Sequence, residues 1–486
     1  MSVIDQLHQL ISSLTQSEKR SFKIFASRHV QGEKNNYVEL FDEIARQESY
    51  DETAIRTHFA GTSFVNRLSY EKNYLRKLIF RAMRGYKERS DTEAKVRYLI
   101  ADAAFLRRKG LYEQEARALE KAFEIAQKYE KFHFELEILD LQRQTIVVER
   151  VQIKDKIAHN QKLRSEVLDQ LANFYQYQNL ADLLFVQVRG QYELSEEEKN
   201  QTLSSTLELA WMKGEEHAKS WRAKISYLKA RAHICQLLGN RDELYMVQER
   251  MRELWVKNPH FKNDEPVEYI IVLANLLNAA LLCQKWERME SILREMEHLS
   301  VATTHEKAEV SQNYLFFSLL LFLNTRRLGK ALSLVEKIES ALHKYQSRFN
   351  RARILAFYHN ITLLFLMTNN YEEALNWSRL VLNYEKSDHR NDVRSKARFL
   401  QLIFHYELGN YEFLLLSLLR SLERYLNEWD RKNEGEELIL QTFQKLPASP
   451  KTDHLKELEK LYTRLPQYPQ TLCYNEFMFY LEHKLK

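Results

Sequence analysis

The chain has 486 residues but only 10 Gly and 6 Pro, well below the usual shares of about 7% and about 5%. So few turn-forming residues exclude a sheet-rich fold, which needs frequent Gly- or Asn-rich turns. With 44% apolar and 29% charged residues, the chain can bury a core and long disordered stretches are not expected. Its net charge of +5, from 72 bases and 67 acids, is too small for nucleic-acid binding by the whole surface, so any such binding must be local.

Residues 1–90 lack the repeated pattern found further along and predict a small helical bundle. Credible helix caps are Ser17, Asp51, and Thr62 or Ser63 after Gly61. The first 14 residues contain an acid and no basic leader, so they indicate an amphipathic helix rather than a signal peptide.

The helix expected over residues 64–86 is strongly two-sided when read at about 100° per residue. One side is an apolar stripe of Phe64, Leu68, Leu75, Leu78, Ile79, Ala82 and Tyr86. The other side carries bases and tyrosines, with Asn66 and Asn73 among them: Arg67, Tyr70, Tyr74, Arg76, Lys77, Arg81, Arg84 and Lys87. Residues 67–89 hold eight bases against two acids, so positive charge is concentrated here.

Two interpretations of this basic side are open. Cations can neutralise phosphates while tyrosines stack on bases, which predicts a nucleic-acid site. Residues 52–61 before it even permit a helix-turn-helix, with Asn66, Arg67 and Tyr70 facing a groove. Alternatively, the side is a solvated helix face, or docks on an acidic surface or partner.

From about residue 95 a second pattern recurs, in which a long amphipathic helix ends in a short turn and an aromatic or aliphatic residue opens the next helix. The turns lie near Gly110 and Tyr112, Gly239, Trp286, Leu328 and Ala331, Asn369 and Tyr371, and Gly409 and Tyr411. This pattern predicts stacked helix-turn-helix units over residues 91–430. Residues 130–215 show it least and indicate one or two unusually long helices.

These units resemble the tetratricopeptide repeat family. Asn369, Tyr371 and Ala374 match the turn, aromatic and small positions of that repeat, and the pairs Gly110 with Tyr112 and Gly409 with Tyr411 match the first two. The interval from Tyr371 to Tyr411 is 40 residues, longer than the roughly 34 of the regular repeat.

The resemblance implies an all-α fold: an α-α superhelical solenoid of tetratricopeptide-like helix pairs beside the small N-terminal bundle. It also implies a peptide-binding concave surface, lined by the first helix of each pair. His359, Leu363, Phe399 and Tyr406 are expected to form an apolar strip on that surface. Residues 431–486 hold four of the six prolines and are expected to cap the last repeat.

No recognisable motif indicates catalysis, a cofactor or a metal. The chain has no HExxH zinc motif, no phosphate-binding loop and no GxSxG nucleophile turn. Its three cysteines are widely separated, which predicts neither disulfides nor a zinc site and fits a cytoplasmic location. The longest apolar run, residues 314–323, is half the length of roughly 20 residues that a membrane-spanning helix needs, so no membrane partner is expected.

The sequence therefore predicts a non-enzymatic scaffold that binds a protein or peptide partner. The alternative is a regulator whose basic N-terminal helix binds nucleic acid while the repeats sense a partner. An enzyme whose catalytic groups come from distant helices is a third possibility, which no feature of the sequence favours.

Overall fold

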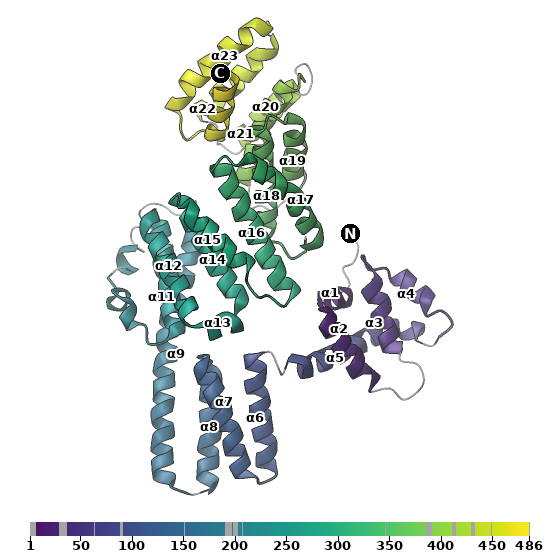
Figure 1. Cartoon of the computed structure of the whole chain (residues 1–486), viewed down its shortest axis with the longest axis vertical. Helices are drawn as coiled ribbons and strands as arrows, with labels where there is room; N and C mark the ends of the chain where they lie inside the picture. Colours follow the sequence, from purple (N-terminus) through teal and green to yellow (C-terminus); the bar gives the residue numbers. More distant parts are fainter. Residues whose placement is uncertain are drawn as a thin grey trace. The chain divides into compact units, whose positions relative to one another are not determined.

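The computed structural model describes residues 6–28, 36–62, 64–87, 91–149, 151–189, 197, 203–206, 208–345, 347–384, 391–410, 415–428, 433–448 and 450–485. Within these ranges the protein is all-α, with no strand, as the sequence predicted (Figure 1). Contacts divide the chain into two compact units: Met1–Cys283 with Ser300–Glu306, and Gln284–Leu299 with Lys307–Lys486.

The first unit begins with a helical bundle. Its elements are α1 (Gln6–Ser13), α2 (Gln16–Ser27), α3 (Asn36–Arg46), α4 (Glu52–His58), the 3₁₀ turn η1 (Val65–Arg67) and α5 (Leu68–Lys87). Asp51 caps α4 as predicted, but the cap of α2 is Thr15, which exchanges side-chain and backbone hydrogen bonds with Glu18; the predicted cap Ser17 lies inside the helix. Thr62 is not a helix cap, because its hydroxyl donates to the carbonyl of Phe59 and η1 begins after Phe64; Ser63 is outside the described residues. Buried side chains from all five helices form a core within the bundle.

Four long antiparallel helices follow, each packed on its neighbour in the chain (Figure 1). They are α6 (Thr92–Arg108), α7 (Tyr112–Lys128), α8 (Phe132–Glu149) and α9 (Ile153–Arg189). With 37 residues, α9 is the unusually long helix expected in this region. Its first half packs on α8 through Val167, and its second half packs on α11 (Trp221–Leu237) through Tyr177, which contacts Tyr227 edge to face.

The rest of the first unit is an aromatic-rich helical cluster. It contains the 3₁₀ turns η2 (Ala210–Met212) and η3 (Glu215–His217), then α11, α12 (Arg241–Lys257), α13 (Pro259–Asp264) and α14 (Pro266–Leu282). Trp221 stacks on Phe261 with ring centres 3.8 Å apart and meets Trp255 edge to face. These rings fasten α11, α12 and α13 together.

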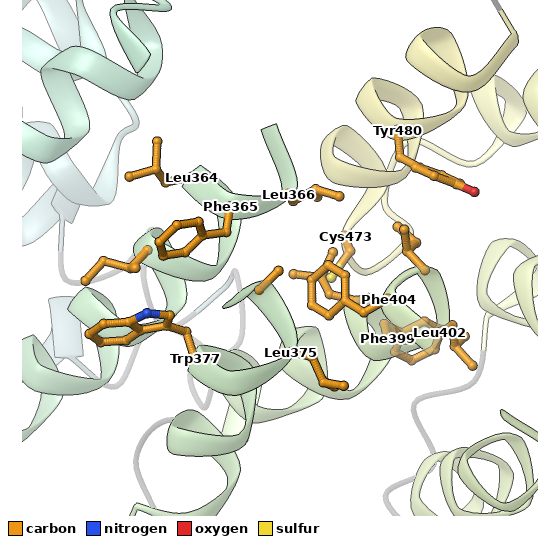
Figure 2. Close-up of a cluster of buried hydrophobic side chains, with 14 of the residues drawn as sticks. Leu364, Phe365, Leu366, Leu375, Trp377, Phe399, Leu402, Phe404, Cys473 and Tyr480 are labelled. Atoms are coloured by element: carbon orange, nitrogen blue, oxygen red, sulfur yellow. The ribbon is translucent and has the colours of Figure 1, made fainter. Parts of the chain in front are cut away.

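The second unit is also built of helices only within the described residues. Its helices are α15 (Trp286–Glu297), α16 (Thr304–Asn324), α17 (Leu328–Tyr345), α18 (Arg351–Met367), α19 (Tyr371–Asn383), α20 (Asn391–Glu407), α21 (Leu416–Glu428), α22 (Glu434–Lys445), α23 (Lys451–Arg464) and α24 (Tyr474–Leu485), with η5 (Leu446–Ala448) and η6 (Leu465–Gln467) between the last ones. One core joins α16–α20 to the C-terminal helices. Figure 2 shows part of it, where Phe399 and Phe404 of α20 lie near Cys473 and Tyr480.

The same backbone motif closes many of the helices. Gly110, Gly239, Asn369 and Gly409 adopt left-handed conformations, with φ between 57° and 73°. In each case the next residue donates its N–H to the carbonyl five residues earlier, as Asn370 does to Phe365 over 2.9 Å. This Schellman cap turns the chain sharply enough for an antiparallel partner to follow. Glu130 and Arg326 form the same cap without a glycine or asparagine.

The signature residues that carry the tetratricopeptide resemblance lie at these turns. Tyr112 and Tyr371 are the first residues of α7 and α19. Ala374 is fully buried one turn further along α19. Tyr411 is outside the described residues.

Candidate binding surfaces

The apolar side of α5 anchors it in the N-terminal bundle. Six residues of the stripe, Phe64, Leu68, Leu75, Leu78, Ile79 and Ala82, are buried, and Tyr86 is half-buried. The ring of Phe64 also packs against Phe59 at the end of α4, with centres 5.1 Å apart. The orientation of α5 is therefore fixed, and its opposite side faces outward.

That outward side is here called the basic face. Its described side chains, all exposed, are Arg67, Tyr70, Tyr74, Arg76, Lys77, Arg81 and Arg84; the side chain of Lys87 is outside the described part of the chain. Tyr70 is 66% exposed, which is unusual for a large aromatic residue. None of the five cations forms an ion pair with any described carboxylate. The structure thus gathers these residues on one open surface.

The other charged groups of α5 are used inside the bundle. Lys72 lies 3.6 Å from Glu52 and donates a hydrogen bond to the hydroxyl of Tyr50. Glu71 accepts a 2.6 Å hydrogen bond from the hydroxyl of Tyr37, and burial together with this carboxylate raises the pKa of Tyr37. Because Glu71 is turned inward, the basic face itself contains no acid of α5.

The junction between α4 and α5 has the elements of a helix-turn-helix. Gly61 adopts a φ of 80°, which reverses the chain after α4. Asn66 and Arg67 are exposed on η1, and Tyr70 is exposed on the first turn of α5. The amide, the guanidinium and the ring therefore lie at the N-terminal end of the second helix, where such motifs contact base edges.

The expected peptide strip does not form a surface. Phe399 has no exposed area, Tyr406 and His359 are also buried, and only Leu363 is partly accessible. The C-terminal helices cause this difference, because they fold back onto α18 and α20. Tyr406 lies against His454 of α23, and Tyr480 of α24 donates a hydrogen bond to Glu407 at the end of α20.

Leu363 instead lines a pocket that the sequence did not reveal, here called the Leu363 pocket. It has a volume of about 270 Å³ and lies between α16, α18 and α24. Its lining includes apolar side chains, with polar groups beside them: Leu320, Leu323, Leu363, Leu366, Met367, Phe479, Asn324, Asn360, Asn475, Glu476 and Arg326. The amide groups of Asn324 and Asn360 donate to carbonyls of their own helices over 2.8 and 2.7 Å. Of the residues that line this pocket, only Leu363 was predicted from the sequence as a candidate binding residue.

A larger hollow of about 460 Å³ lies in the first unit, and a network of paired charges lines one edge of it. Lys131 Nζ lies 3.0 Å from Asp264 and 3.2 Å from Glu265, and Arg222 is bonded to the same Glu265. Burial opposes ionisation of Glu265, but these two cations lower its pKa. Glu130 accepts hydrogen bonds from the first two N–H groups of α11. The paired charges fasten the α7–α8 turn to α11 and α13, which is a structural role.

Among the described residues no cluster of three or more His, Cys, Asp or Glu side chains is arranged to hold a metal ion. Likewise, none of the helices in the described ranges is both long and apolar enough to cross a bilayer. Comparison with protein-family models, with curated proteins and with solved structures finds no match to this chain.

Proposed function

We propose that the protein is a non-catalytic scaffold whose tetratricopeptide-like helical array binds a protein or peptide partner. The observation that carries this proposal is the Leu363 pocket, in which apolar side chains of α16 and α18 lie beside side-chain amides and the start of α24. Peptide-binding grooves commonly combine apolar pockets with polar groups that can bond a peptide backbone. The expected ligand is a short segment that inserts one apolar side chain.

Selection of displayed peptides on the full-length protein tests this proposal. For the selected peptides, Leu363→Asp should weaken binding at least tenfold, because it places a charge among apolar side chains. Leu380→Asp is a matched control, since Leu380 is an exposed leucine on α19 outside the pocket. Equal binding by wild type and Leu363→Asp would remove the pocket as the site, and failure to select any peptide would count against the scaffold itself.

A second candidate function is nucleic-acid binding through the basic face, with the helical array sensing a partner. The specific observation in its favour is the set of five exposed cations without a carboxylate partner in the described chain, next to two exposed tyrosines. Cations of this kind neutralise phosphates and release the counterions bound to the nucleic acid, and tyrosine rings can stack on bases. The N-terminal end of α5 would contact bases and its C-terminal half would contact phosphates.

Fluorescence anisotropy with labelled DNA and RNA, over a salt series, tests this second candidate on the full-length protein. Binding should weaken steeply as salt rises, and Arg81→Glu combined with Arg84→Glu should reduce it at least tenfold. Lys121→Glu with Lys128→Glu is the control, because it changes the net charge equally at exposed sites on α7. If both double variants lose affinity to the same extent, the effect is one of overall charge and the basic face is not the site.

A further inference from the structure

The two turns α6–α7 and α8–α9 meet at one end of the four-helix array (Figure 1). Gly110–Gln114 of the first turn and Val151 and Lys156 of the second line the same shallow hollow. Arg107, at the end of α6, also donates hydrogen bonds to Gln144 and Thr145 of α8. This end of the array, here called the tip, is therefore one continuous surface.

The tip exposes an unusual amount of apolar surface. Six large apolar side chains there are each between 42% and 57% exposed: Phe105, Leu111, Val147, Val148, Val151 and Ile153. Two of them, Val147 and Val148, are adjacent in the chain, so the last turn of α8 presents apolar atoms over much of its width. Scattered exposed apolar residues need no explanation, but six of them within two neighbouring helix turns point to a contact surface.

The same helix ends also carry exposed cations. Arg108 and Lys109 lie at the C-terminal end of α6. Arg143 lies in the second half of α8, and Lys154 lies at the start of α9. None of the four forms an ion pair with a described residue. Of the described acids on these turns, Glu113 is bonded to Arg117, which leaves Asp155 as an exposed acid beside the cations.

The combination of charge and apolar surface decides between possible occupants. A second copy of the tip would bring like charges together, and a nucleic acid would leave the six apolar side chains without a partner. An anionic lipid surface satisfies both features, because apolar side chains enter the boundary between headgroups and acyl chains while Lys and Arg lie at the phosphates. A fluid surface also requires no matching shape.

We infer that the tip docks the protein peripherally on anionic lipid membranes. Val148, Val151 and their apolar neighbours insert at the headgroup level, and Arg108, Lys109, Arg143 and Lys154 bind lipid phosphates or carboxylates. This contact involves no membrane-spanning segment, and it departs from the sequence-based expectation that the protein has no membrane partner. It is independent of the Leu363 pocket and of the basic face.

Co-sedimentation of the full-length protein with vesicles tests the inference. Vesicles of phosphatidylcholine with phosphatidylserine should retain the protein, and vesicles of phosphatidylcholine alone should retain at least tenfold less. Loss of one cation near a charged surface is expected to weaken binding roughly fivefold. Arg108→Glu with Lys154→Glu reverses two charges, so it should reduce retention by more than that. Val148→Asp with Val151→Asp should reduce it at least tenfold, since charged groups replace the inserted side chains.

Two controls make the outcome decisive. Val186→Asp changes a 66% exposed valine in the last turn of α9, far along the helix from the tip, and should leave retention unchanged. Arg81→Glu with Arg84→Glu removes charge from the basic face and should also leave it unchanged. Absence of retention by the anionic vesicles overturns the inference, as does retention lost with the α5 variant but kept by both tip variants.

Discussion

A single buried carboxyl group, Glu135 at the start of α8, couples the stability of the first unit to pH. Its side chain is only 2% exposed, and its Oε1 atom has no hydrogen-bond partner in the described structure. Burial, followed by the nearby charge of Glu130, raises the pKa of Glu135 from 4.5 to about 7. The folded state therefore favours the protonated form. This contribution to stability is complete below about pH 4.5 and is lost as the pH rises through 7.

Replacement of Glu135 by glutamine should remove this pH dependence. At pH 8 the neutral amide avoids the buried charge, so Glu135→Gln should raise the free energy of unfolding by up to about 3 kcal/mol, at about 1.4 kcal/mol per pKa unit. At pH 4.5 the two proteins should differ little. Urea denaturation at both pH values measures the effect. Glu137→Gln, at an exposed position on the same helix, is the control. An equal change at both pH values would show that Glu135 is not the titrating group.

At the scale of helices, the turns show which structural features are encoded locally. Gly110, Gly239, Asn369 and Gly409 are residue types that favour the left-handed conformation, so the turns they form could be predicted from the sequence. The cap at Glu130 could not, because a glutamate carries no such preference and is held there by packing and by its bonds to α11. The two-sided character of α5 was predictable for the same local reason, since its pattern lies within one helix.

The left-handed turns predict a contrast between two substitutions. Gly239→Ala should lower the free energy of unfolding by about 1 kcal/mol, because the left-handed conformation strains any residue with a Cβ atom. No atom lies within 4 Å of the added Cβ, so the cost is that of the backbone alone. Gln284→Gly, at a φ of 55°, should leave stability within about 0.5 kcal/mol, since strain relief and the greater chain entropy of glycine oppose each other. Thermal unfolding compares both; equal losses would contradict the argument.

A buried ion pair joins three helices of the first unit. Glu115 of α7 is 1% exposed and accepts bonds from Arg107 of α6 over 2.9 Å and from Thr145 of α8 over 3.0 Å. Arg107→Ala leaves this carboxylate buried without its cation, so it should cost about 3 kcal/mol. Glu115→Ala with Arg107→Ala should cost less than the sum of the single changes. Urea denaturation of the four proteins gives the coupling, and strict additivity would show that the pair contributes nothing.

At the scale of the whole molecule, the sequence failed where the site depends on distant segments. The expected strip placed Phe399 and Tyr406 on a concave surface, as in a regular repeat. The structure buries both, because α23 and α24 return across α18 and α20. The Leu363 pocket likewise needs Phe479, more than a hundred residues along the chain from Leu363. Such return packing depends on non-local contacts that helical periodicity does not encode.

The two proposed binding activities lie in different compact units, and this predicts that they are separable. Arg81→Glu with Arg84→Glu should weaken nucleic-acid binding at least tenfold and leave peptide affinity within twofold of wild type. Leu363→Asp should do the reverse. Salt should distinguish them as well: phosphate contacts release counterions, so nucleic-acid affinity falls steeply between low and physiological salt, whereas insertion of an apolar side chain is far less sensitive. Anisotropy with one labelled peptide and one labelled oligonucleotide, on each variant at two salt concentrations, measures all these affinities. Loss of both activities in either variant would mean that the units do not act independently, because each substitution changes a side chain that only one of the proposed sites contains.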